Sequence, residues 1–370
     1  MFDEQEGKTN FSQYKKVDTL KVRGFCEALF CAYGFSSDDS KIITDVLLRA
    51  DLYGIESHGV QRLVRYHDEI TNGQVDINAK LKIVHESPIS VCIDANKAMG
   101  QLAGVESMKL AVKKAKVSGC GMVTVRNSNH YGIAGYYTNI AADEDLIGIS
   151  MTNTEAICVP TFGSQAMTGT NAIALAMPSD PFTFSYDAST TVVPRGTLEV
   201  FRKNEKPLPD NWALDANGNP CNDAAVVIDN IIAKAGGGIA PLGGLGMLNG
   251  GHKGYGLSVM VDLFSSVISS GLTSNHVNRQ PGHTGICHYF MAIDYGIFGD
   301  KQTIKNNMSK FLQELRDSKK AEGQNRIYTH GEKEAETMSQ RINGQIPINK
   351  KTLNEIKVIA EKQGIKNIDF

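Results

Sequence analysis

The sequence lacks most of the short motifs that identify a bound cofactor or a catalytic nucleophile. It contains no G-x-G-x-x-G and no G-x-x-x-x-G-K-[ST], so neither a Rossmann dinucleotide turn nor a P-loop is supported. Its nine scattered histidines form no H-x-x-x-H or H-E-x-x-H pattern, and no G-x-S-x-G is present. Cys158 stands in the apolar run ICVP without a base beside it. The sequence therefore predicts no metal site and no nucleophilic catalysis.

The chain also lacks a charge excess and a cysteine framework. It carries 38 Lys and Arg against 40 Asp and Glu, a net charge of -2, so no basic stripe indicates nucleic acid or an acidic membrane. At 370 residues and 41% apolar content it is long enough for two domains. Its seven cysteines are an odd number without a C-x-x-C pair, which predicts free, buried thiols in a reducing compartment.

No stretch reads as a signal or a membrane span. The first residues, MFDEQEGKTNFSQYKK, lack the apolar core of a secretory signal. The longest apolar stretch, residues 255–272 (YGLSVMVDLFSSVISSGL), contains Asp262 and five serines and is too polar to cross a bilayer. We therefore expect a buried helix there and a soluble, cytoplasmic protein.

Two helices are predicted near the amino terminus. The segment SSDDSKIITDVLLRADLYG opens with the N-cap candidates Ser36 and Ser37, places its apolar residues on one face and ends at Gly54. A second helix is predicted to begin near Ser57, within ESHGVQRLVRYHDEITNG, and to stop at the final Asn-Gly pair.

From residue 81 to 194 the sequence pattern changes to short β-rich runs, which alternate with glycine turns and with an amphipathic helix, MKLAVKKAKVSG. The polar segments KPLPDNWALDANGNP and AGGGIAPLGGLG predict loops and a possible hinge. A last strand-like run, HYFMAIDYGIF, precedes a charged helical tail from Lys301. The pattern predicts an α/β or α+β fold with helices at both ends and a sheet domain in the middle. The β-rich runs are LKIVHE, SVCIDA, MVTV, LIGISMTN, NAIALAMPS and FTFSYD.

The stretch SHGVQRLVRY is the first candidate site. If it is helical, His58, Arg62 and Tyr66 fall at i, i+4 and i+8 and line up on one face. The guanidinium offers a bidentate fork that matches a carboxylate, so this stripe can hold an anion. A solvated polar face has the same spacing, and spacing alone does not decide between the two.

The stretch RNSNHYGIAGYYTN is the second. CGMVTV before it predicts a strand and residues 133–145 after it a helix, so His130 is expected at a strand-to-helix turn. An imidazole titrates near neutrality and can take a proton from a hydroxyl or return it to a carbonyl. The alternative is a core histidine bonded to a backbone carbonyl. Gly132 and Gly135 permit a close approach of ligand to backbone and favour the functional interpretation.

Three glycine loops could hold phosphate: GTNAIALAMP, SYDASTTVV and NGGHKGYG. The last precedes a long apolar run, so it offers a helix amino terminus and Lys253 to an anion. By composition alone, a glycine loop is more often a turn than a phosphate cradle.

These segments together resemble one known family. SHGVQRL, NSNHYGIAGYY, GTNAIALAMPS, DASTTVVPRGTLEV, WALDANGNP and GGHKGYGLSVMVDLFSSVISSG are similar, in order, to the malate/L-lactate dehydrogenase family, which includes ureidoglycolate, sulfolactate and diketogulonate dehydrogenases. The resemblance covers residues 39–334. Each motif is weak alone, but six in order are specific.

The resemblance implies a nicotinamide-dependent oxidoreductase acting on 2-hydroxy acids or their 2-oxo partners, with malate and oxaloacetate the leading pair. It implies an α/β fold unlike the Rossmann type: a central mixed-sheet, cofactor-binding domain, here residues 81–284, and a helix-rich domain from residues 1–80 and 285–370. It also implies a homodimer, with NAD as the expected cofactor and NADP as the alternative.

The resemblance assigns roles by position. His130 matches the family's catalytic acid/base, and His58 and Arg62 match residues that face the substrate. Arg62 is the candidate for the substrate carboxylate, and Ser57 and Tyr66 lie beside these residues. The positions matched to the dinucleotide are Thr154, Asn171, Asp187, Ala188, Ser189, Thr190, His252, Lys253 and Gly254.

Three departures from the family pattern stand out. The family commonly reads D-M-A-T-S where this chain has DASTT, and often has a lysine where this chain has Thr197. Both changes lie by the expected cofactor and bear on the choice between NAD and NADP. The family's P-G-E is replaced by HGE at residues 330–332, a change that we interpret as structural.

The exact substrate is open at this stage. Lactate, ureidoglycolate, diketogulonate and other acids of the family fit the same residues, as does a cyclic imino acid. A non-catalytic ligand-binding homologue would keep the fold as well.

Overall fold

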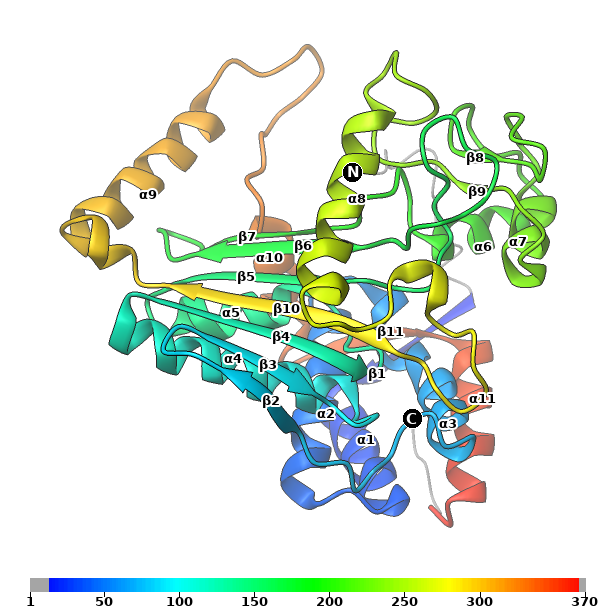
Figure 1. The fold of residues 1–370 in the computed structure, drawn as a ribbon, viewed down its shortest axis with the longest axis horizontal. Coiled ribbons are helices and arrows are strands. Elements are labelled where there is room, and N and C mark those ends of the chain that lie inside the picture. The colour runs from blue at the N-terminus through cyan, green and yellow to red at the C-terminus, as the bar shows by residue number, and fades with distance from the viewer. Residues whose placement is uncertain (1–12, 366–370) are drawn as a thin grey trace. The chain divides into compact units, whose positions relative to one another are not determined.

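A seven-stranded mixed sheet organises the computed structural model, which describes residues 13–365 (Figure 1). The strand order is β2-β3-β4-β10-β5-β6-β7; only β3 and β4 run parallel, and the other neighbours are antiparallel. This confirms the predicted α/β class. The strands are β2 (Lys82–Glu86), β3 (Ser90–Asp94), β4 (Cys120–Ser128), β5 (Ile147–Thr152), β6 (Ala172–Met177), β7 (Phe184–Ala188) and β10 (Ile286–Ile293).

All of the predicted β-rich runs form strands, because alternating and β-branched residues fit a pleated sheet. The last run of the sequence lies in the middle of the sheet. β10 pairs with β4 on one side and β5 on the other, although more than a hundred residues separate it from either in sequence.

Helices cover both faces of this sheet. On one face lie α4 (Gly100–Ser118) and α5 (Gly135–Asp143), which approach closely because Gly104 leaves room for the ring of Tyr137. On the other lie α8 (Gly251–Asp262) and a π-helical turn, Leu263–Val267 (Figure 1). The helix α9 (Lys301–Asp317) follows β10.

The expectation of one buried helix over residues 255–272 was wrong. The α-helix ends at Asp262 and continues as the π-helical turn. Val259, Met260 and Leu263 are each 45% exposed. Hydropathy therefore identified an apolar helix but not its surroundings, since residues 13–365 leave one face of α8 half exposed.

The segments predicted to be loops and a hinge form a small module instead. Two short strands, β8 (Ala213–Leu214) and β9 (Gly238–Ile239), pair antiparallel and pack with α6 (Arg195–Lys203) and α7 (Ala224–Ala233). Sequence analysis missed this module because its strands are short and lie in glycine-rich segments. The apolar residues of its core are also scattered through the sequence. That core includes Ile157, Val193, Leu198, Leu208, Val227, Ile228 and Ile239.

The chain divides into two compact units. The first, described here for residues 13–73 and 332–365, pairs β1 with β11 in an antiparallel ribbon beside five helices. The predicted N-cap is confirmed, since the Ser36 hydroxyl accepts a hydrogen bond from the Asp39 amide. Its elements are β1 (Tyr14–Asp18), α1 (Thr19–Tyr33), α2 (Ser37–Leu52), α3 (Leu63–Thr71), α10 (Glu332–Arg341), β11 (Gln345–Asn349) and α11 (Lys350–Lys362).

The second unit comprises residues 74–331 and holds the whole seven-stranded sheet. The predicted boundary at 284/285 differs from this division, because it would separate β10 from the two strands that it pairs with. The predicted boundary at 80/81 lies within seven residues of the break after Gly73.

The seven cysteines are all free thiols, as predicted, but only Cys26, Cys158 and Cys287 are buried. Within residues 13–365, no helix is both long and apolar enough to cross a bilayer. Short 3-10 turns lie at Glu56–His58, Val60–Arg62, Ser274–His276 and Tyr295–Phe298.

A buried carboxylate joins several parts of the sheet unit. Asp262, 7% exposed at the end of α8, accepts hydrogen bonds from the amides of Asn153 and Asn171 at 3.1 and 2.8 Å. It also accepts from the Ser266 hydroxyl and from both the amide and the hydroxyl of Ser274. The two asparagine amides and the two donors of Ser274 thus satisfy this side chain, and a buried carboxylate is stable only when its oxygens are satisfied.

We therefore predict that Asp262→Ala lowers the free energy of unfolding by about 3 kcal/mol or more, because it strands buried donors. Urea unfolding followed by circular dichroism measures this. Asp229→Ala, which removes an exposed ion pair with Arg202, is the control and should change the free energy by less than about 1 kcal/mol. An equal effect of the two substitutions would contradict the assigned role of Asp262.

Candidate active site

His130 occupies the turn between β4 and α5, as the sequence predicted. β4 ends at Ser128 and α5 begins at Gly135. The Gly132 amide points at the His130 ring and lies 3.4 Å from Nδ1, a long contact in which Nδ1 accepts. A neutral imidazole has one protonated and one unprotonated ring nitrogen, so it can donate at one and accept at the other. The imidazole therefore lies against the backbone of its own turn.

The backbone of this turn is fixed by its neighbours. The buried Asn129 amide donates to the carbonyl oxygens of Gln74, Lys97 and Ala98 at 3.2, 3.0 and 3.0 Å. A Cβ built on Gly100 would lie 2.3 Å from the Asn129 carbonyl oxygen and 2.4 Å from that of His130. The start of α4 thus packs directly on the peptide that carries His130, and only glycine fits there.

Asp187, a predicted cofactor residue, lies next to the same turn. Its Oδ2 accepts a hydrogen bond of 2.7 Å from the Gly135 amide, at the first residue of α5. A carboxylate at a helix amino end is favourable, because free amides and the helix dipole are positive there. Asp187 therefore links β7 to the turn of His130 whether or not it also contacts a nucleotide.

The other predicted substrate residues belong to the first unit. The Ser57 hydroxyl lies 2.9 Å from Nδ1 of His58, and Nε of Arg62 donates to the Ser57 carbonyl oxygen at 2.6 Å. The structure thus brings Ser57, His58 and Arg62 together. Tyr66 is buried in α3, at 1% exposure.

The predicted continuous helix with a His-Arg-Tyr stripe was wrong. Glu56–His58 and Val60–Arg62 are separate 3-10 turns, and α3 begins only at Leu63. Gly59, in an extended conformation, interrupts them, and its missing Cβ would lie 2.1 Å from Oδ1 of Asp51. The other carboxylate oxygen accepts the Val60 amide at 2.8 Å. The chain bends around the Asp51 carboxyl group instead of continuing as a helix.

Arg341 of α10 holds the same turns from the other side. One guanidinium nitrogen donates to the Asp51 carbonyl oxygen at 2.5 Å, and another lies 3.2 Å from Oε1 of Glu56. Asp51, Glu56 and Arg341 thus fix the backbone that presents His58 and Arg62. Sequence analysis missed all three, although a lone aspartate at the end of an apolar helix was a visible signal.

Burial sets the charge of these groups. It raises the pKa of Asp51 to about 8, with Glu56 adding to the effect and the Val60 amide and Arg341 opposing it. Burial, together with the positive charges of Arg62 and Arg65, lowers the pKa of His58 to about 3. His58 is therefore a neutral hydrogen-bonding group at physiological pH, and the cation of this cluster is Arg62.

The predicted cofactor residues Thr154, Asn171 and Thr190 meet around residue 170. The Thr154 hydroxyl accepts the Thr170 amide at 3.0 Å, and the Thr190 amide and hydroxyl both donate to the Thr170 carbonyl oxygen. Asn171 is fully buried, and its amide group bonds Ser258, Asp262, Ser274 and the Thr154 backbone. The Asn171 side chain therefore holds the loops in place rather than facing solvent.

The remaining predicted cofactor residues border this group. Thr190 accepts the Leu242 amide at 2.9 Å, and a Cβ on Gly254 would lie 2.2 Å from the Leu242 carbonyl oxygen. The backbone at Leu242 thus contacts both Thr190 and the first turn of α8. Ala188 ends β7, and the Ser189 hydroxyl donates to the Thr191 carbonyl oxygen.

The amino end of α8 suits an anion. The helix begins at Gly251 with no side-chain cap, Lys253 is exposed in its first turn, and Nδ1 of His252 is buried without a hydrogen-bond partner among the described residues. Free amides, the helix dipole and a lysine attract a phosphate. These residues fit the diphosphate of a dinucleotide, although the sequence has no G-x-G-x-x-G.

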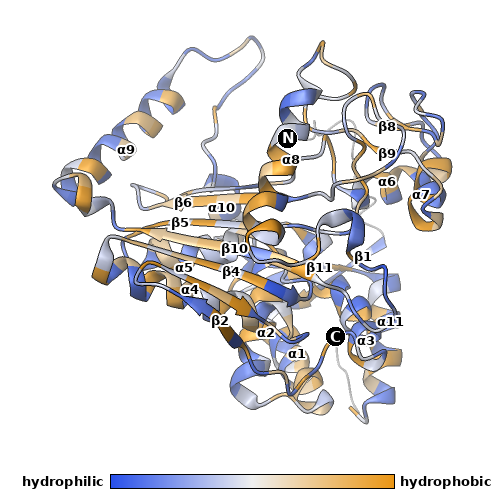
Figure 2. Ribbon diagram, in the orientation of Figure 1, coloured by the Kyte–Doolittle hydropathy of each residue, from blue (hydrophilic) through white to orange (hydrophobic). Residues whose placement is uncertain are grey.

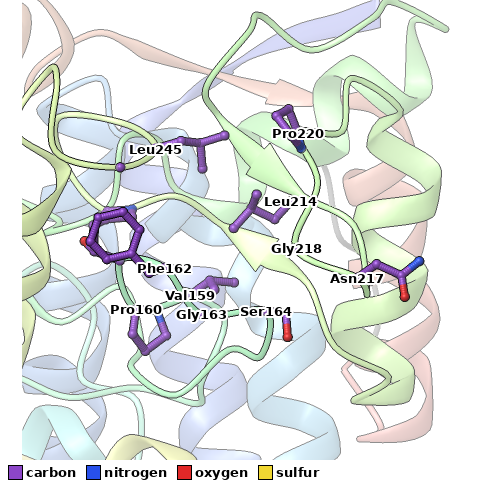
Figure 3. A pocket seen from close by; sticks show the side chains of 13 residues that line it. Val159, Pro160, Phe162, Gly163, Ser164, Leu214, Asn217, Gly218, Pro220 and Leu245 are labelled. Carbon is purple, nitrogen blue, oxygen red and sulfur yellow. The ribbon is translucent and has the colours of Figure 1, made fainter.

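A separate cavity of about 400 Å³ opens in the small module (Figure 3). Its lining combines apolar side chains, such as Phe162 and Leu214, with the polar side chains of Ser164 and Asn217. None of the residues predicted for substrate or cofactor lines it.

The HGE segment, where the chain departs from the family pattern, packs on β7 and the residue before it. Gly331 has a φ of +99° and packs on the Thr183 carbonyl oxygen, and the His330 ring contacts Phe184 and Tyr186 edge to face.

A histidine suited to proton exchange and a helix amino end suited to a diphosphate, both in the sheet unit, are elements of a nucleotide-dependent oxidoreductase. Comparison with known proteins agrees. The model of the malate/L-lactate dehydrogenase family matches residues 17–357. The chain therefore belongs to the malate/L-lactate dehydrogenase family and is an oxidoreductase, a class that uses a nicotinamide cofactor.

Individual relatives extend over almost the whole chain. The malate dehydrogenase of Pyrococcus abyssi is 43% identical over 357 residues, which cover 96% of this chain and 97% of that protein. The L-sulfolactate dehydrogenase of Methanocaldococcus jannaschii is 35% identical over 91% of this chain and 94% of its own length. The crystal structure of malate dehydrogenase from Entamoeba histolytica superposes with a TM-score of 0.92 at 35% identity, covering 96% and 99% of the two chains.

The buried Asp51 makes a prediction about stability and pH. Between its unfolded pKa of 3.8 and its folded pKa of about 8, the folded chain holds a proton that the unfolded chain has lost. The free energy of unfolding therefore falls as pH rises through this window, and Asp51→Asn should remove that slope while keeping an acceptor for the Val60 amide. Urea unfolding between pH 6.5 and 8 measures this, above the range in which His58 contributes.

The control is Asp45→Asn, on the same helix, whose carboxylate pairs at the surface with Arg23 and Arg49. It should leave the slope as in the unsubstituted protein. An identical pH dependence in Asp51→Asn and the unsubstituted chain would show that Asp51 is charged in the folded state.

Proposed function

We propose that this protein is an NAD-dependent malate dehydrogenase that interconverts malate and oxaloacetate, with NADP as the alternative cofactor. The observation that carries the proposal is His130, which is held at the end of β4 with Nδ1 turned to the Gly132 amide. The 43% identity to a malate dehydrogenase over nearly the whole chain supports the substrate. The predicted cytoplasmic location stays a prediction.

Arg62 has the role of binding the substrate carboxylate. Its Nε is held by the Ser57 carbonyl oxygen, so the plane of the guanidinium is fixed before substrate arrives. A guanidinium matches a carboxylate through paired hydrogen bonds, and such positioning can lower a barrier by several kcal/mol. The neutral His58 beside it contributes a hydrogen bond and no competing charge.

His130 has the role of general acid and base. Neutral His130 takes the proton of the C2 hydroxyl in the oxidation of malate, and its protonated form returns that proton to the carbonyl oxygen in reduction. His58, whose pKa is lowered to about 3, is neutral at pH 7 and has no proton of this kind to give, so the role falls to His130.

The nicotinamide ring, when bound, supplies or accepts the hydride. The residues proposed to hold the dinucleotide are the first turn of α8, with His252, Lys253 and Gly254, and the loop residues 187–190 with Thr154. Asn171 acts indirectly, because its amide group is bonded within the protein. The choice of NAD rests on the family resemblance, and the DASTT sequence and Thr197 are where the pattern departs.

The first test compares His130→Ala and Arg62→Ala. His130→Ala should reduce kcat by roughly 10²–10⁴-fold while leaving NADH affinity intact, because it removes only the proton exchange. Arg62→Ala should raise KM for oxaloacetate and lower kcat. The measurement is NADH absorbance during turnover, with binding followed by NADH fluorescence.

The control is His85→Ala, an exposed histidine on β2 of the same sheet unit, which should keep full turnover. Normal turnover in His130→Ala would exclude the acid/base role. Pyruvate, sulfopyruvate, oxalurate and a cyclic imino acid, each with NADH and NADPH, complete the panel and decide between malate and the alternative substrates. Nucleotide binding without turnover across the panel would favour the non-catalytic homologue.

We also propose that the protein is a homodimer. The apolar face of α8 consists of Val259, Met260, Leu263, Val267 and Ile268, each between 45% and 54% exposed (Figure 2). In residues 255–272 the one charged residue, Asp262, is buried beneath this face. An uncharged apolar surface of this kind suits a two-fold contact with a second copy, in which the same patch is used twice without like-charge repulsion.

Replacing Met260 and Val267 together by Glu should convert the dimer to a monomer, because four charges would meet across the two-fold axis. Light scattering coupled to size exclusion measures the mass. Val117→Glu, at an 84% exposed apolar residue on α4, is the control and should leave the dimer intact. A dimer that survives the double substitution would place the contact elsewhere, and a monomeric unsubstituted protein would remove the proposal.

A further inference from the structure

A second histidine lies beneath the turn that carries His130. His288 is in β10, opposite Val125 of β4 and Thr152 of β5, and it is completely buried. Nothing in the proposed reaction uses it. A fully buried histidine in the middle of a sheet needs a reason, because desolvation of an imidazole must be compensated by hydrogen bonds.

Both ring nitrogens of His288 have partners. Nδ1 lies 2.8 Å from the Thr152 hydroxyl, and Nε2 lies 2.9 Å from the Ser128 hydroxyl. The single proton of Thr152 has carbonyl acceptors at Asn153 and Cys287, at 3.1 and 3.2 Å. The backbone of Asn129 is a further hydrogen-bond partner of the ring. A neutral ring donates at one nitrogen and accepts at the other, so Thr152 and Ser128 hold it from both sides.

The ring of His288 also stacks on Tyr131. The centroids are 4.3 Å apart and the planes are inclined by 9°. Tyr131 stacks in turn on Tyr137 of α5 at 4.6 Å, and its hydroxyl lies 3.1 Å from that of Ser150. His288 thus contacts Ser128, two residues before His130, and Tyr131, the residue directly after it.

Burial lowers the pKa of His288 to about 3. The ring of His288 is therefore neutral at physiological pH. Only a neutral ring can donate at one nitrogen and accept at the other, so its pattern of bonds to Thr152 and Ser128 does not change with pH.

We propose that His288 is a positioning residue for His130: it fixes Ser128 by a hydrogen bond and Tyr131 by stacking, and thereby sets the angle at which the catalytic imidazole meets its substrate. The inference rests on the proposed role of His130. Because small displacements of a catalytic group cost rate, with about 1 Å worth on the order of 10²-fold, loss of this support should appear in kcat.

Two substitutions of His288 separate its two hydrogen bonds. The amide of Gln can replace Nε2 and keep the bond to Ser128, whereas the shorter Asn replaces Nδ1 and keeps only the bond to Thr152. If support passes through Ser128, His288→Gln should retain most of kcat and His288→Asn should lose roughly 10–100-fold. NADH affinity should be unchanged in both, and circular dichroism and thermal unfolding establish that both are folded to a similar extent.

The decisive measurement is a double-mutant cycle with His130→Ala. If His288 acts through His130, adding His288→Asn to His130→Ala should cause no further loss of kcat, because the group it positions is already absent. A purely structural role would instead multiply the two losses. Multiplied losses, or equal kcat for the Gln and Asn variants, would overturn the proposal.

Failure of the proposed function gives a different result. If His130 is not the acid/base, the single variant His130→Ala keeps its turnover, and the cycle shows this before His288 is considered. A large loss in His130→Ala combined with multiplied losses in the cycle would remove only the positioning role of His288.

Discussion

The insertion of β10 between β4 and β5 is the constraint on which the sheet unit depends. Both of its neighbours pair with it along its length, so neither β4 nor β5 has another partner on that side. Because side chains alternate along a strand, the register that places His288 between Val125 and Thr152 also fixes which face it occupies. The imidazole then meets Ser128 at the end of β4 and Tyr131 just beyond it. The position of His130, the candidate base, thus depends on a strand that is distant in sequence and lies in the middle of the sheet.

The same principle operates in the first unit with a different group. Asp51 receives the Val60 amide and excludes any side chain at Gly59, and this bends the chain that carries His58 and Arg62. In both units a half-buried candidate functional group lies against a buried polar group that is itself hydrogen-bonded. Such buried networks are costly to break and specify one geometry, which a purely apolar contact would not. This explains why two short, glycine-containing turns can hold candidate catalytic side chains without regular helix around them.

Sequence analysis predicted the strands, the turn of His130 and the class of fold, because those depend on local periodicity and on six ordered motifs. It failed where an interaction is long-range. The helix predicted through Gly59 does not form, because the Asp51 carboxyl group occupies the space beside Gly59. Local helix propensity takes no account of such a contact. The apolar run of α8 was assigned to the interior, since hydropathy does not distinguish a face covered by the same chain from one left exposed. His288 gave no signal, because one histidine in a strand-like run looks the same whether or not its nitrogens find partners.

Burial also distinguishes His58 and His288 from an ordinary imidazole. His58 and His288 are both shifted to a pKa of about 3, in each case mainly by loss of water, so both serve as fixed hydrogen-bonding groups. A general acid and base must change its protonation near the working pH, and neither can do so. His130, in a turn with Gly132 and Gly135, is the histidine for which we propose that role. Within the sheet unit, His288 thus supports the turn of His130 with a ring whose protonation is constant at physiological pH.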